Sequence, residues 1–257
     1  MSQLSIVIPT CNRATHLHQA LQAIRNGTSC DYEVVVVDGA STDKTPALLR
    51  EMKKEWGTQL RVIREPAREG FVRAVNKGLR AARGDCLIWL NDDARPLPGA
   101  LDTALKTLHK HGSNVGLVGL FHRCNVERNI AYEVVHQQTT FRLLHVRGTL
   151  YANFGMGRRE TFSTMDYFDE GYFLNAADPD FSLKVWAAGM RVVPAFGAYI
   201  DHDEHTDDRR SVDATRGKTD NDRLFTKWDL PPRNTLRNDF DPANPCTLGR
   251  HPLRRTA

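Results

Sequence analysis

Three adjacent polar residues, Asn91, Asp92 and Asp93, follow the apolar run at residues 86–90 and carry the ligand atoms that hard cations prefer. Carboxylate and amide oxygens bind Mg²⁺ or Mn²⁺, and such an ion can bridge a diphosphate. Asn and Asp also favour turns, and Pro96 follows closely, so a plain strand-to-loop turn is the alternative interpretation. Taken alone, the three residues leave a metal site and a turn both open.

The elements around these residues predict an α/β fold. Short apolar runs typical of buried strands alternate with segments of helical periodicity, at residues 4–8, 17–24, 34–37, 45–56, 60–63, 72–82 and 86–90. This alternation predicts an open, mostly parallel sheet with helices on both faces. Ligands of such sheets bind outside the carboxyl ends of the strands. Residues 10–13, 38–43 and 91–93 directly follow strands, so the predicted fold itself places them at a site.

The pattern loosens in the second half of the chain. Strands are expected at residues 115–121 and 130–135, and a short amphipathic helix at 181–188. From Asp201 the chain turns polar. The segment from residue 231 is rich in Pro, Asn and Arg, and we expect it to wrap the surface or to be partly disordered.

Composition limits the class of protein without naming it. The chain has 257 residues, of which 40% are hydrophobic and 26% charged, and its formal net charge is +4. This is ordinary globular composition, and so mild a basic excess suits an anionic ligand as well as a solvated basic face. No two of the five cysteines have zinc-ligand spacing, which favours a reducing compartment. Neither a signal peptide nor a membrane span is expected, so a cytoplasmic location is predicted.

Four blocks of the sequence, at residues 5–13, 36–43, 70–93 and 168–202, resemble the glycosyltransferase family 2 proteins of the GT-A fold, in the family's order. The resemblance implies an inverting enzyme that uses a nucleotide sugar. It implies a Rossmann-like sheet with a smaller acceptor-side sheet. The expected domain spans 1–230, with a nucleotide-binding half at 1–115 and an acceptor and catalytic half at 116–230, followed by a C-terminal tail at 231–257.

The resemblance also assigns roles on the donor side. Asp38 matches the residue that hydrogen-bonds the base, usually uracil or thymine, and a carboxylate can accept the N3–H of such a base. A turn residue before Gly39 is the alternative for Asp38. The other residues matched to nucleotide binding are Pro9, Thr10, Arg13, Asn91 and Asp92.

The metal and the catalytic base follow from the same comparison. The resemblance makes Asp93 the main metal ligand, in an Asp-X-Asp motif whose first carboxylate is replaced by Asn91. His202 completes the site, with His205 as a competitor. The implied cofactor is Mn²⁺ or Mg²⁺. Asp178 matches the base that deprotonates the acceptor hydroxyl. Asp180 is instead expected to cap the helix that follows.

Substrates remain open at this point. A UDP- or dTDP-sugar donor is expected, with a carbohydrate, glycolipid or other hydroxyl acceptor, by default a bacterial surface glycan. The basic tail leaves open a polyanionic acceptor such as modified DNA, although nucleic acid is not expected. Because Asn91 and Ala177 depart from the family pattern, a catalytically inactive sugar-nucleotide-binding protein is an alternative. A nucleotidyltransferase is disfavoured because residues 10–14 lack the glycines of a triphosphate loop.

Overall fold

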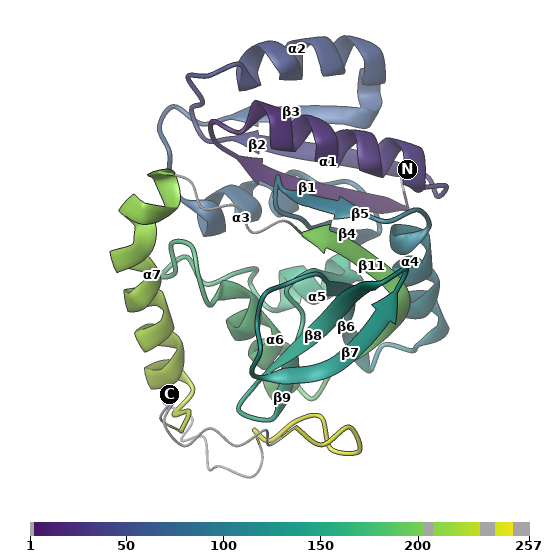
Figure 1. The fold of residues 1–257 in the computed structure, drawn as a ribbon, viewed down its shortest axis with the longest axis vertical. Coiled ribbons are helices and arrows are strands. Elements are labelled where there is room, and N and C mark those ends of the chain that lie inside the picture. The colour runs from purple at the N-terminus through teal and green to yellow at the C-terminus, as the bar shows by residue number, and fades with distance from the viewer. Residues whose placement is uncertain (1–2, 203–207, 232–239, 249–257) are drawn as a thin grey trace.

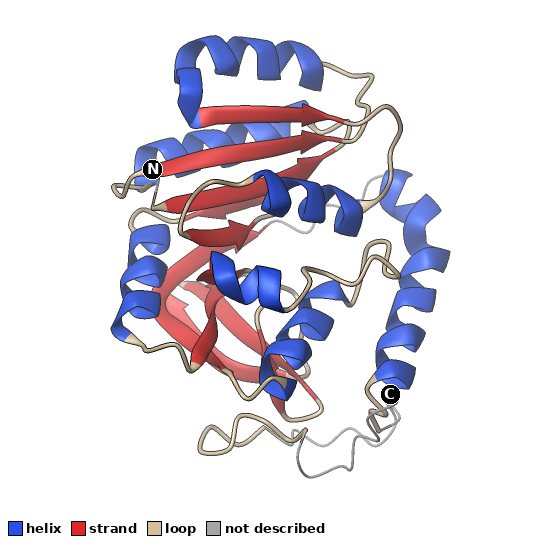
Figure 2. Ribbon diagram, turned by 180° about the vertical axis from the view of Figure 1, so that it is seen from behind, coloured by secondary structure: helices blue, strands red, loops and turns tan. Residues whose placement is uncertain are grey.

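A long mixed sheet runs through the molecule, with helices on both of its faces (Figures 1 and 2). The structure is a computed structural model that describes residues 3–202, 208–231 and 240–248. In these residues the main path of the sheet has the strand order β3-β2-β1-β4-β10-β6-β11-β5.

The first half of the chain builds the parallel part of the sheet. Its elements are β1 (Leu4–Thr10), α1 (Ala14–Gly27), β2 (Tyr32–Asp38), α2 (Thr45–Trp56), η1 (Gly57–Gln59), β3 (Leu60–Arg64), α3 (Phe71–Ala81) and β4 (Cys86–Trp89). β1 pairs in parallel with β2 on one side and β4 on the other. All seven residues of β2 are buried, as expected for a parallel strand covered on both faces. The predicted βα alternation is therefore confirmed.

Pro9 lies within β1, beyond the apolar run at residues 4–8 from which the strand was predicted. β1 continues to Thr10, with Pro9 opposite Val37 of β2. The pairing with β4 stops at Val7, so Pro9 lies where β1 has lost its second neighbour and a missing N–H is tolerated.

The second half adds strands of both directions. Its elements are β5 (Ala94–Pro96), α4 (Ala100–Lys110), β6 (Val115–His122), β7 (Ile130–His136), β8 (Thr139–Val146), β9 (Thr149–Tyr151), β10 (Gly155–Arg158), α5 (Arg159–Thr164), α6 (Ala177–Ala187), β11 (Arg191–His202) and α7 (Asp208–Lys227). β10 is antiparallel to β4 and β6, whereas β11 is parallel to β6 and antiparallel to β5. β7, β8 and β9 branch off as the smaller sheet that the resemblance implies.

Alternate side chains of the strands feed two hydrophobic cores. Ile6 and Ile8 of β1 pack with residues of α1, α2 and α4 on one face. Val7 packs with residues of α3, α5 and α6 on the other. This alternation follows from the two-residue period of a strand, in which successive side chains point to opposite faces of the sheet.

The helices of the C-terminal part differ from prediction. The short helix expected at 181–188 begins earlier, at Ala177, so Asp178 and Asp180 both lie within α6. α7 was not predicted, because its sequence is polar and few apolar residues mark the face that packs on the protein. Leu224 is one of its residues that is buried in the second core. No helix of residues 3–202, 208–231 and 240–248 is long and apolar enough to cross a membrane.

The described part of the tail packs against the smaller sheet. The Leu150 N–H donates to the Pro245 carbonyl at 2.8 Å, and the ring of Phe240 stacks on His145. The segments 203–207, 232–239 and 249–257, and with them the candidate His205, lie outside the described residues.

Candidate active site

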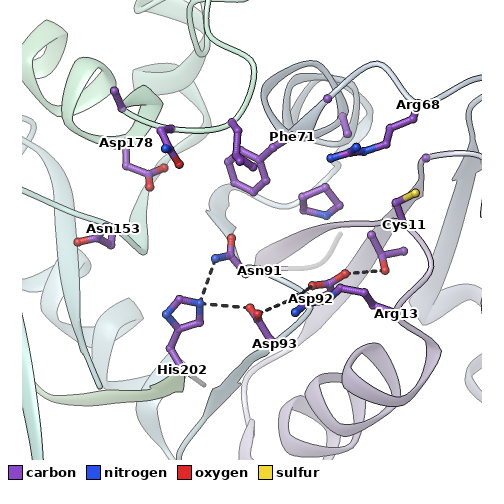
Figure 3. A pocket seen from close by; sticks show the side chains of 18 of the residues that line it. Cys11, Arg13, Arg68, Phe71, Asn91, Asp92, Asp93, Asn153, Asp178 and His202 are labelled. Atoms are coloured by element: carbon purple, nitrogen blue, oxygen red, sulfur yellow. Dashed lines mark hydrogen bonds and ion pairs between the residues drawn. The ribbon is translucent and has the colours of Figure 1, made fainter. Parts of the chain in front are cut away.

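A cavity of about 540 Å³ opens at the carboxyl ends of β1 and β4 (Figure 3). Of the residues that the sequence predicted for the site, those that line it are Pro9, Thr10, Arg13, Asn91, Asp92, Asp93, Asp178 and His202. In the view of Figure 3, Asp178 lies at one end of the pocket and Arg13 toward the other, with Asn91 and His202 between them. Residues far apart in the chain thus meet at the predicted edge.

Strand register brings Asp93 and His202 together. β11 runs antiparallel to β5, with His202 opposite Ala94, the residue after Asp93. The Nε2 atom of His202 lies 3.2 Å from Asp93 Oδ1 and 3.2 Å from Asn91 Nδ2. Asp201, on the same strand, is held from the outside by Arg95 and Arg123, which fixes the end of β11.

Arg13 joins both carboxylates of the loop. Its Nη1 lies 2.9 Å from Asp92 Oδ1 and 2.6 Å from Asp93 Oδ2, and all three side chains are almost fully buried. Thr10 donates a further hydrogen bond to Asp92 Oδ2 at 2.8 Å. Both oxygens of Asp92 therefore contact protein partners, Arg13 and Thr10. Asp93 contacts Arg13 through Oδ2 and His202 through Oδ1.

The charge of Asp93 is stabilised despite its burial. Burial alone would raise the pKa of this carboxyl, but the hydrogen bonds and charges of His202 and Arg13 outweigh it and hold the pKa well below its usual range. Asp93 is thus an anion at any physiological pH, as a metal ligand must be.

The group of Asn91, Asp93 and His202 fits a divalent cation. Nε2 of His202 carries either a proton or a lone pair, so it cannot satisfy both the Asn91 amide N–H and the Asp93 carboxylate as they lie. A cation among the three, with the amide oxygen turned toward it, would satisfy all of them. Among the described residues, no group of three or more His, Cys, Asp or Glu side chains could hold a metal ion, so an ion here would need further ligands from a bound diphosphate.

His122 lies behind His202, with its ring centroid 6.3 Å away. Burial, and to a smaller extent the charge of His202, lower the pKa of His122 to about 3. It is therefore a neutral packing partner of His202, and sequence reasoning did not single it out.

Asp178 faces the pocket from the first turn of α6. Burial raises its pKa to about 8, and the indole N–H of Trp89 opposes that rise. Its Oδ1 has no hydrogen-bond partner among the described residues, and Figure 3 shows the carboxylate directed into the cavity. A carboxyl group with a raised pKa and an open oxygen can accept a proton from a bound hydroxyl.

Asp38 is not among the residues that line the pocket. Its Oδ1 accepts the Ser41 N–H at 3.0 Å, and the side chain is almost fully buried beneath Gly39, which does line the cavity. The base-reading role of Asp38 stays a prediction.

Several lining residues were missed by sequence reasoning. Glu65 directly follows β3, so the rule that ligands bind at the carboxyl ends of strands could have found it, and Phe71 lies in the 70–93 block of the resemblance. Tyr151 carries no local signal, because only the fold brings it to the cavity. Among the basic residues between β3 and the end of α3, Arg68 lines the pocket. Lys77 is instead bound between Glu65 and Glu69, and Arg73 lies beside Glu170.

The mixed sheet with a pocket at its strand ends is that of the GT-A fold. The glycosyl transferase family 2 model matches residues 5–165, more than half of the chain, and the chain belongs to this family. The similarity of solved structures agrees with the fold. The mannosyltransferase PcManGT from Pyrobaculum calidifontis, solved with GDP-Man and Mn²⁺, has a TM-score of 0.69 and 22% identity, over 90% of this chain and 66% of that one.

Curated relatives are more similar in sequence. A GalNAc(5)-diNAcBac-PP-undecaprenol beta-1,3-glucosyltransferase of Campylobacter jejuni is 30% identical over half of this chain, but the match spans only 40% of that enzyme. An uncharacterized glycosyltransferase of Bacillus subtilis, YwdF, is 26% identical over 90% of this chain and 87% of its own. Staphylococcus aureus TarS in complex with UDP-GlcNAc has a TM-score of 0.63 at 21% identity, over 81% of this chain and 60% of that one.

Proposed function

We propose that the protein transfers a sugar, with inversion, from a nucleotide-sugar donor to an acceptor hydroxyl, in a reaction that depends on Mn²⁺ or Mg²⁺. The observation that carries the proposal is one pocket with Asp178 at one end, the Asn91, Asp93 and His202 group in its middle, and Arg13 and Arg68 toward the other. This order matches the order of sugar, diphosphate and nucleoside in a donor.

Asp178 acts as the base in this proposal. Its carboxylate accepts the proton of the acceptor hydroxyl as the hydroxyl oxygen bonds to the anomeric carbon, and the bond from that carbon to the diphosphate breaks. Attack from the face opposite the leaving group inverts the configuration. Raising the pKa of Asp178 to about 8 makes it a stronger proton acceptor than an ordinary aspartate.

Asn91, Asp93 and His202 would hold the divalent cation. Bound there, the ion supplies charge that offsets the negative charge growing on the departing diphosphate. Arg68, which lines the nucleotide end, can add to that stabilisation.

The acceptor is proposed from the relatives and not from the pocket. The Campylobacter relative is named for an undecaprenol-linked glycan, and two mycobacterial relatives are named for PGL/p-HBAD biosynthesis, so a bacterial surface glycan is the leading class. The donor is proposed to be a UDP- or dTDP-sugar. GDP-sugars belong in the same test, because the Pyrobaculum structure holds GDP-Man.

The test is a screen of donor turnover. UDP-, dTDP- and GDP-sugars are incubated with the protein and Mn²⁺ or Mg²⁺, with and without undecaprenol-linked acceptors, and release of the nucleoside diphosphate is measured. We expect turnover with one nucleotide class, abolished by EDTA and reduced about 10²–10⁴-fold in Asp178→Asn. Binding of the nucleoside diphosphate without turnover of any donor would favour the inactive-binder alternative.

A further inference from the structure

Helix α7 holds a buried carboxylate, Asp220, against the backbone of residues that line the pocket. Asp220 is 3% exposed, although it lies on a helix that is polar along most of its length. α7 lies along one edge of the molecule in Figures 1 and 2. Nothing in the transfer reaction described above uses this residue.

The carboxylate of Asp220 binds three successive backbone N–H groups. Phe173 N–H donates to Oδ1 at 3.0 Å, and the N–H groups of Leu174 and Asn175 each donate to Oδ2 at 2.8 Å. Such an arrangement resembles an anion held in a nest of backbone donors, and hydrogen bonds to a charged acceptor are among the stronger ones in proteins.

These three residues begin the 173–176 loop, which leads into α6. Leu174, Asn175 and Ala176 line the cavity, and Asp178 follows in the first turn of the helix. Ala176 has a φ of +62°, a conformation that non-glycine residues adopt only where the surroundings hold them. Contacts between the loop and the rest of the protein must therefore maintain this backbone conformation.

The other side of the loop is bound to the nucleotide half. The Phe173 carbonyl accepts the Phe71 N–H at 3.0 Å, at the start of α3, where no side chain caps the helix. Phe71 itself lines the pocket. The loop thus connects α3 with α7, and Asp220 is the acceptor that fixes its far side.

We propose that Asp220 is a positioning residue of the transfer reaction, holding the 173–176 loop, and through it Asp178, at the wall of the pocket. The inference rests on the proposed function, in which Asp178 is the base. A displacement of about 1 Å at a reacting group can cost about 10²-fold in rate. Loosening the loop should therefore lower the rate of transfer more than the affinity for the nucleotide.

The test compares Asp220→Asn with Asp222→Asn. An amide offers a single oxygen acceptor and brings its own N–H donors, so Asp220→Asn cannot keep all three bonds. Asp222 is exposed on the same helix, and its substitution makes the same change in charge. Hydrogen exchange of residues 173–175, binding of UDP and GDP with Mn²⁺ by calorimetry, and kcat and KM with the preferred donor are measured for both variants.

We expect Asp220→Asn to speed exchange of the three amides at least about tenfold and to lower kcat by about 10–100-fold, with nucleotide affinity and donor KM within about threefold of wild type. Asp222→Asn should match wild type in every measurement. Faster exchange with an unchanged kcat would overturn the proposal, and so would equal losses in the two variants.

Asp220→Glu is the second variant, in case Asp220→Asn folds poorly. It keeps the charge but moves the carboxylate by one methylene relative to the N–H groups of Phe173, Leu174 and Asn175, so it perturbs the same three hydrogen bonds. The same loss of kcat is expected, and a wild-type kcat would overturn the proposal. A wild-type protein that turns over no donor would contradict the proposed function, whereas the exchange of residues 173–175 separately decides whether Asp220 anchors the loop.

Discussion

Asp178 is a half-buried carboxyl group on the pocket wall, and as the proposed base it should make the reaction depend on pH. Burial raises its pKa to about 8. If it is the base, kcat should rise about tenfold per pH unit below 8 and level off above it. The measurement is kcat between pH 6 and 9.5 at saturating donor. A profile that stays flat through pH 8 would exclude Asp178 as the titrating base.

The stability of Asp178→Asn provides a control that needs no substrate. Below the ordinary carboxyl pKa, Asp178 is neutral in the folded and the unfolded chain. Between that value and about 8, only the unfolded chain ionises, so rising pH increasingly favours unfolding of the wild type. Asp178→Asn lacks this contribution, and its Tm advantage over wild type should grow from pH 4 to pH 8 by at least about 2 °C and then level off.

The proposed cation site gives a prediction about metal affinity. Asn91→Asp supplies a second anionic ligand beside Asp93 and His202, so it should tighten Mn²⁺ binding about tenfold in the presence of the nucleoside diphosphate. Asp93→Asn should weaken it at least as much. Bound and free Mn²⁺ are separated by electron paramagnetic resonance. Equal affinity in wild type and Asp93→Asn would remove Asp93 from the ligand set.

At the scale of elements, Asp180 shows how α6 and α7 are joined. It does not cap α6, as the sequence had suggested, because the helix starts at Ala177 and its N-cap position is Ala176. Its fully buried carboxylate instead receives hydrogen bonds from the Tyr172 hydroxyl, the Trp228 indole and Lys227.

Asp180→Asn should therefore lower the stability of the protein by more than the loss of a helix cap would. The substitution removes one of the two carboxylates that pair with Lys227, the other being Asp169, and part of the buried acceptor capacity. The free energy of unfolding should fall by roughly 2–3 kcal/mol, against about 1 kcal/mol for a lost cap. Urea unfolding of Asp180→Asn and of the exposed control Asp222→Asn measures the difference. A loss no larger than that of the control would contradict the anchoring role.

The sequence predicted helices well where their apolar periodicity was strong. It predicted them poorly where tertiary contacts determine whether a helix forms or where it begins. The helix at 45–56 matches α2 at both ends, since its apolar face is regular. α6 was placed late because its start depends on the left-handed backbone of Ala176, which no residue type announces. α7 was missed because buried polar side chains such as Asp220, and not an apolar stripe, bind it to the rest of the protein.

At the scale of the whole molecule, the pocket lies across both halves of the sheet, so nucleotide binding should stabilise the fold as a unit. At 100 times its Kd, a ligand adds about 2.7 kcal/mol, or about 5–10 °C in Tm. UDP or dTDP should give this protection, and Asp38→Ala should abolish it. Equal protection of wild type and Asp38→Ala would fit the buried position of the Asp38 carboxylate and remove its role in reading the base.

The donor side of this pocket was predictable because its residues directly follow strands, and Thr10 and Asp92 lie where the pattern placed them. Tyr151 and Asn221 were not predictable, because they reach the cavity only through long-range packing. A sequence pattern of local period carries no information on such contacts.

The place of β11 in the sheet has a consequence for synthesis of the protein. β11 lies between β6 and β5, and β5 pairs with no other strand among the described residues. A nascent chain that has not yet released residues 191–202 from the ribosome has neither this inner strand nor the imidazole of His202. An incompletely translated polypeptide would therefore carry β1 to β4 while lacking the His202 side chain of the proposed cation site.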